Sequence, residues 1–121
     1  MRIVVADEDI VSRKKLRRIL DQKGLEVVGE AKNGLHVFHK YVEVLPDLLI
    51  MSLNMSMYDG LSTLRRIMDY NKDAKIVVMV EEGENKKAFE AMACGAIHYL
   101  TLPLEKQQIE LLIEDVIRIL E

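Results

Sequence analysis

The chain has 121 residues, half of them hydrophobic and 31% charged, with a formal net charge of -3. This composition is typical of a globular protein with one core, and it argues against a nucleic-acid surface, which needs a clustered basic face. The single cysteine, Cys94, excludes an internal disulfide, and no apolar run reaches the ~20 residues of a membrane span. We therefore expect a cytoplasmic protein without a leader and without a membrane partner.

Short apolar runs alternate with helically spaced segments along the first half of the chain. Residues 3–6 form an apolar run, and a helical pattern follows and stops near Gly24. A weaker, alternating run covers residues 25–29. The turn residues Asn33 and Gly34 then precede a second helical pattern, which ends before Pro46.

The second half of the chain repeats this alternation of strand and helix patterns. Strands are expected at 48–51, 76–80 and 97–100. A third helix is expected after Asp59 and Gly60, and a fourth ends near Gly95. The last helix covers about 105–120.

Five strands that alternate with five helices predict a single α/β domain over residues 1–121. The runs at 3–6, 48–51 and 76–80 do not alternate, which is typical of parallel strands buried on both faces. We expect a three-layer, doubly wound sheet in the flavodoxin-like order 2-1-3-4-5. Ligands in such folds bind beyond the carboxyl ends of strands one and three, where Asp7 and Ser52 stand.

Several stretches of the sequence carry a specific pattern. The stretch from Pro46 to Gly60 reads as a buried strand, a loop and a helix start. Residues 5–13 place acidic side chains directly after the first strand, and Gly95, Tyr99 and Pro103 stand around the last one. Together these stretches and their spacings resemble the central segment, the acidic motif and the last strand of the receiver domains of response regulators in two-component signalling. The resemblance covers the whole chain and implies a cis peptide bond before Pro103.

Three positions depart from what this resemblance implies for phosphoryl transfer. Ser52 matches the aspartate that accepts the phosphoryl group, Val80 matches a threonine or serine, and Leu102 matches a lysine. Serine lacks the negative charge and is a weak nucleophile unless a base activates it. Valine and leucine offer no hydrogen-bond donor. The three changes together indicate a degenerate receiver rather than an enzyme.

Adjacent carboxylates follow the first strand, at Asp7 and Glu8. Such a pair can hold a hard divalent cation, although acidic residues here can also cap a helix N-terminus. The resemblance matches them to a Mg²⁺-binding pair. Because Ser52 replaces one charged ligand, we expect no required cofactor and at most weak Mg²⁺ binding.

The last helix carries apolar residues over a broader arc than one core face needs. Leu111 lies outside that arc and roughly aligns with Leu104, which indicates either a partner surface or generous packing. The resemblance implies that partners or a second copy bind the face formed by the fourth helix, fifth strand and fifth helix, with Tyr99 as its switch aromatic. We expect Tyr99, Leu104 and Leu111 to form this contact.

These observations favour a phosphorylation-independent signalling or protein-interaction module. One alternative is an active phosphorelay receiver that uses Asp7 or Ser52 as its acceptor. Another is a small-ligand-binding domain with the flavodoxin-like fold. The latter is the weakest, because no glycine-rich phosphate loop follows the first strand.

Overall fold

The computed structural model describes residues 1–120 as strands and helices in strict alternation. The strands are β1 (Arg2–Ala6), β2 (Glu26–Ala31), β3 (Leu48–Ser52), β4 (Ile76–Glu81) and β5 (His98–Leu102). The helices are α1 (Ile10–Gln22), α2 (Gly34–Val44), α3 (Gly60–Tyr70), α4 (Asn85–Ala93) and α5 (Lys106–Leu120).

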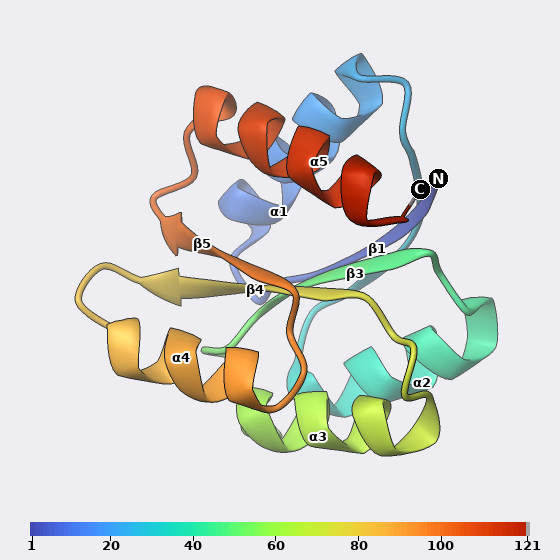
Figure 1. Cartoon of the computed structure of the whole chain (residues 1–121), viewed down its shortest axis with the longest axis vertical. Coiled ribbons are helices and arrows are strands. Elements are labelled where there is room, and N and C mark those ends of the chain that lie inside the picture. The colour runs from blue at the N-terminus through green and yellow to red at the C-terminus, as the bar shows by residue number, and fades with distance from the viewer. Residues whose placement is uncertain (121) are drawn as a thin grey trace.

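The strands form one parallel sheet in the order β2-β1-β3-β4-β5. Helices α1 and α5 cover one face, and α2, α3 and α4 cover the other (Figure 1). This arrangement confirms the predicted three-layer, doubly wound fold. Within residues 1–120, no helix is both long and apolar enough to cross a bilayer.

The sheet separates two hydrophobic cores. Val4, Leu49 and Val78 face the core under α2, α3 and α4, while Ile50 and Val77 face the core under α1 and α5. Strand β3 lies at the centre and is buried along its whole length. Full burial of each such aliphatic side chain stabilises the fold by roughly 1.5–3 kcal/mol, which explains why the central strands are apolar on both faces.

Three helices begin at a side-chain cap that the sequence supplies. Asp9 accepts from the Val11 backbone N–H at the start of α1, Asn33 accepts from the His36 N–H in α2, and Asp59 caps α3 in the same way. Helix α4 differs, because its N-cap residue Glu84 makes no capping bond. The Glu84 carboxylate instead bonds to residues at the carboxyl edge of the sheet.

The edge strands differ from their predicted bounds. Strand β2 continues to Ala31, whose carbonyl accepts from the Asp7 backbone N–H at 3.0 Å. Strand β5 continues to Leu102, which pairs with Glu81 of β4. In both cases backbone pairing with a more central strand lengthens an edge strand whose own residues show only a weak strand pattern. The Leu102–Pro103 peptide bond is cis.

Candidate functional site

The carboxyl ends of four strands bring the predicted site residues to one edge of the sheet. Asp7 directly follows β1 and Ser52 ends β3. The β3–β4 register places Val80 one position beyond the residue that pairs with Ser52. Val80 itself pairs with Thr101, so Leu102 is again one position further along β5. The fold therefore gathers all four positions where ligands of such sheets bind.

Asp7 is buried, with only 3% of its surface exposed. Its Oδ1 accepts from the Asp9 backbone N–H at 2.9 Å, and its main-chain carbonyl accepts from Arg13 Nη1 at 2.7 Å. Within residues 1–120, its Oδ2 has no hydrogen-bond partner. Burial, reinforced by the nearby charges of Asp9 and Glu81, raises the pKa of the Asp7 carboxyl against the lowering effect of the Asp9 N–H and of Arg13.

Glu8 is exposed and reaches across the edge to another loop. Its Oε2 accepts from the Ser56 backbone N–H at 2.5 Å. This bond ties the β1–α1 loop to the β3–α3 loop and occupies one oxygen of the carboxylate. Glu8 therefore has a structural partner within the chain.

Ser52 is almost inaccessible, with 2% of its surface exposed. Its Oγ accepts from the Asn54 backbone N–H at 3.1 Å, a local turn that orders the start of the β3–α3 loop. Among the described residues, no side chain accepts a hydrogen bond from the Ser52 hydroxyl. The Ser52 side chain therefore stabilises the turn that follows β3.

The other two predicted positions are apolar and packed. Val80 is completely buried in the core under α2, α3 and α4. Leu102 is partly buried and packs against the opposite core, under α1 and α5. Neither side chain can donate to a phosphoryl oxygen.

A polar cluster that the sequence did not reveal lies beside this edge. Lys87 Nζ donates to Asn54 Oδ1 at 2.6 Å, and Asn54 Nδ2 donates to Glu84 Oε1 at 2.6 Å. Lys87 and Glu84 also form an ion pair at 3.0 Å. The hydrogen bond from Asn54, together with the Glu81 N–H and Lys87, lowers the pKa of Glu84. Only the three-residue spacing of Glu84 and Lys87 was visible in the sequence, because Asn54 is 33 positions from Lys87.

A second surface carries the predicted partner residues. Tyr99 is half-buried on β5 and makes an edge-to-face contact with Phe89 of α4, with 6.5 Å between ring centroids. Phe89 is 62% exposed and Leu111 of α5 is 56% exposed. A groove of about 330 Å³ runs between β5 and α5, and Tyr99 and Leu111 are among the residues that line it.

The expectation that Leu104 belongs to this surface is wrong. Leu104 is only 3% exposed and packs in the core under α1 and α5. It lies two residues before α5 begins at Lys106, so the helical spacing that aligned it with Leu111 does not apply.

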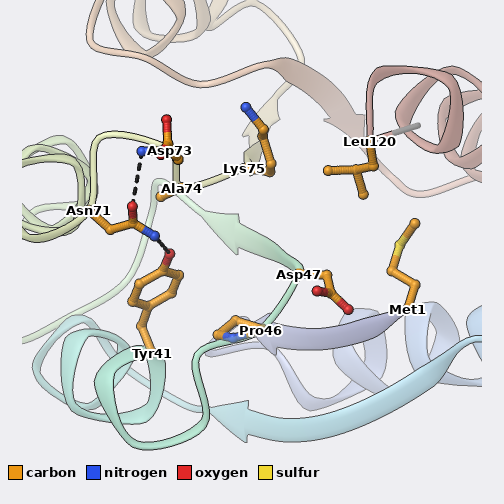
Figure 2. A pocket seen from close by; sticks show the side chains of 9 residues that line it. All are labelled: Met1, Tyr41, Pro46, Asp47, Asn71, Asp73, Ala74, Lys75 and Leu120. Carbon is orange, nitrogen blue, oxygen red and sulfur yellow. Dashed lines mark hydrogen bonds between the residues drawn. The ribbon is translucent and has the colours of Figure 1, made fainter.

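A separate hollow of about 450 Å³ lies at the opposite end of the sheet. Figure 2 shows the Tyr41 hydroxyl accepting from Asn71 Nδ2, at 3.0 Å, at its rim. Asp47 Oδ2 accepts from the Arg2 backbone N–H at 2.7 Å, which joins the starts of β3 and β1. These polar residues serve the packing of strand and helix ends.

The comparisons with known proteins agree with the geometry. The family model described as the response regulator receiver domain matches residues 3–114. The chain belongs to the response regulator receiver family. Receivers are signalling modules of two-component systems that are generally not enzymes themselves, and they typically bind Mg²⁺ at their phosphorylation site.

Individual relatives match this receiver over nearly its whole length. The chemotaxis protein CheY of Thermotoga maritima is 31% identical over 108 residues, covering 89% of this chain and 90% of that protein. CheY of Halobacterium salinarum is 30% identical over 115 residues, covering 95% of each.

Solved structures match it equally well. The response regulator domain of Thermotoga maritima CheB has a TM-score of 0.87 at 28% identity, covering 99% of this chain and 96% of that one. CheY from the CheX-CheY-BeF3-Mg²⁺ complex of Borrelia burgdorferi shares the fold, with a TM-score of 0.92 at 20% identity over 97% of this chain and 89% of that one.

The residues of this receiver fit a metal ion only in part. The unpartnered, buried Oδ2 of Asp7 is an atom that a cation would satisfy. Glu8 is already bonded to the Ser56 N–H, and the Ser52 oxygen is neutral. Within residues 1–120, no group of three or more His, Cys, Asp or Glu side chains is placed to hold a metal.

Proposed function

We propose that this receiver acts without accepting a phosphoryl group, as a single protein-interaction module in cytoplasmic signalling. The observation that carries the proposal is the state of Ser52. Its hydroxyl is buried and accepts from the Asn54 N–H, and no hydrogen bond joins it to a base among residues 1–120. A neutral serine in this setting is a poor nucleophile.

The surroundings of Ser52 support the same proposal. Phosphoryl transfer depends on donors and cations that stabilise charge on the transferred group. Val80 and Leu102 supply neither, because both are apolar and packed into the cores. The ammonium group of Lys87 lies beside the β3–α3 loop, but it is already bonded to Asn54 and Glu84.

Asp7 is an equally poor substitute acceptor. Its side chain is buried and its Oδ1 is bonded to the Asp9 N–H, and burial raises the pKa of the carboxyl, so the reactive carboxylate is less favoured than at an exposed aspartate. The alternative of an active phosphorelay receiver with another acceptor therefore gains no support from Asp7 or Ser52.

We further propose that Mg²⁺ binds weakly at Asp7 and is not required. Asp7 contributes one free oxygen, while one of the two Glu8 carboxylate oxygens is already bonded to the Ser56 N–H. A tightly held divalent ion needs several oxygen ligands with charge.

The partner surface in this proposal is the face formed by α4, β5 and α5. Tyr99 and Leu111 line the groove there, and exposed Phe89 packs on Tyr99; apolar area of this kind on an outer face is typical of a contact site. The occupant is a protein partner or a second copy of the chain.

The deciding experiment is incubation with acetyl phosphate and millimolar Mg²⁺, followed by intact mass measurement. We expect no stoichiometric mass increase under conditions that modify a receiver carrying aspartate, threonine and lysine at the three matching positions. An acid-labile or acid-stable phosphoryl adduct on this chain would overturn the proposal.

A further inference from the structure

We infer that Asn54, Glu84 and Lys87 form a latch that holds α4 in one position, so that the surface of Phe89 and Tyr99 is assembled without any ligand. The three side chains join the β3–α3 loop to the first turn of α4 through three contacts of 2.6–3.0 Å. The inference deepens the proposed function, on which it rests in taking this surface as the partner site.

The bonding in the latch uses both ends of the Asn54 amide, which donates to Glu84 and accepts from Lys87. Glu84 Oε1 also accepts from the Glu81 backbone N–H at 2.8 Å, which closes the β4–α4 loop on itself. Hydrogen bonds that involve charged groups are stronger than neutral ones, so a closed set of this kind restrains the loop.

The latch replaces the usual start of a helix. Glu84 is the N-cap residue of α4 but makes no side-chain cap bond, in contrast to Asp9, Asn33 and Asp59. Its carboxylate is turned to Asn54 and Lys87 instead. The position of the first turn of α4 is therefore set by a tertiary contact with the β3–α3 loop rather than by a local cap.

A continuous set of contacts links the degenerate site to the partner surface. The Asn54 backbone N–H donates to Ser52 Oγ, and the Asn54 side chain holds Lys87 and Glu84. Two residues beyond Lys87, Phe89 packs edge-to-face on Tyr99. Because Lys87 and Phe89 belong to the same helix, α4, fixing its first turn also fixes the position of Phe89 against Tyr99.

Amide hydrogen exchange on the whole chain tests the latch. Asn54→Ala and Lys87→Met should each speed exchange of the α4 amides, including the Ala88 N–H that bonds to the Glu84 carbonyl, by about threefold to tenfold. Glu84→Gln keeps the amide contact but loses the ion pair, so it should give a smaller increase. Lys86→Met is the matched control, because Lys86 is an exposed neighbour on α4 with no ion pair within residues 1–120, and it should leave exchange unchanged.

A latch acts locally, so its loss should affect α4 and spare the central sheet. Faster exchange confined to α4, with a weakened Phe89–Tyr99 cross-peak in NMR, would support the inference. Equal exchange in Lys87→Met and Lys86→Met would overturn it, and so would a uniform increase over the sheet amides in every latch variant. Phosphorylation by acetyl phosphate is measured separately, so an adduct together with the expected exchange would remove the proposed function and leave the latch standing.

Discussion

The Glu8 carboxylate accepts a hydrogen bond from the Ser56 backbone N–H across 48 positions of sequence, at 2.5 Å. This bond gives the second acidic residue of the motif a structural task. It holds the β1–α1 loop against the β3–α3 loop, so one oxygen of the Glu8 carboxylate is already bonded to a backbone donor and is not free for a cation at Asp7.

Mg²⁺ binding should therefore be weak and should depend on Asp7. We expect a millimolar dissociation constant by calorimetry or NMR titration, and no detectable binding by Asp7→Asn, because only Asp7 offers a free, buried oxygen among the described residues. Glu82→Gln removes an exposed carboxylate from the same region and serves as the control. A micromolar dissociation constant, or unchanged binding by Asp7→Asn, would contradict this picture.

Asp7 should also make stability depend on pH. Its pKa is raised from the ordinary value of 3.8, so in the window just above 3.8 the folded state retains a proton that the unfolded chain has released. The folded state then binds more protons, and the contribution of Asp7 to stability falls as pH rises through that window.

Asp7→Asn removes this titration while keeping an acceptor for the Asp9 N–H. We expect the variant to be more stable than the parent at pH 7, and the difference to shrink as pH approaches 4. Urea denaturation at several pH values, with divalent ions chelated, measures it. A difference that stays constant with pH would show that Asp7 does not titrate in this way.

Ser52→Asp alone should not restore phosphorylation. The new carboxylate would stand at the strand end beside Asp7, where two buried like charges oppose each other, and we expect a loss of roughly 1–3 kcal/mol without Mg²⁺. Added Mg²⁺ should recover part of that loss in thermal unfolding. Val80 and Leu102 would still supply no donor or cation.

The triple variant Ser52→Asp, Val80→Thr, Leu102→Lys is the matched comparison. It returns the nucleophile, the hydroxyl and the ammonium group together, so acetyl phosphate should modify it measurably by intact mass. Stoichiometric modification of Ser52→Asp alone would show that phosphoryl transfer needs neither a hydroxyl at position 80 nor an ammonium group at position 102.

The layers and strand order could be predicted from the sequence because strands buried on both faces appear as continuous apolar runs. Strand β3 is buried at every position, and its residues form an uninterrupted apolar run apart from the final serine. The capping residues Asn33 and Asp59 were likewise visible as turn signals. The carboxyl ends of β1 and β3, and with them Asp7 and Ser52, therefore lie at one edge of the sheet as predicted.

What the sequence could not supply were contacts made by the folded topology. The Asn54–Lys87 bond joins residues on different βα units, and no local sequence pattern predicts it. Leu104 was misplaced for a related reason. Helical spacing was applied to a residue that lies in the loop before α5, where the chain turns it into the core.

The partner surface should depend on Leu111. This side chain is 56% exposed on α5 and lines the groove beside Tyr99, so a charge there should disfavour an apolar contact while leaving the core intact. We expect Leu111→Glu to weaken association, with a second copy or with a partner, about tenfold, and to change the free energy of unfolding by less than about 0.5 kcal/mol.

Ile119→Glu is the matched control for this last prediction. Ile119 is 49% exposed on the same helix but is not among the groove residues, so the same charge should leave association unchanged. Sedimentation velocity over a range of concentrations measures self-association. A strict monomer at high concentration would remove the homodimer and leave a heterologous partner. Equal effects of the two substitutions on association would show that α5 carries no specific contact at Leu111, and the face of α4, β5 and α5 would lose its main support.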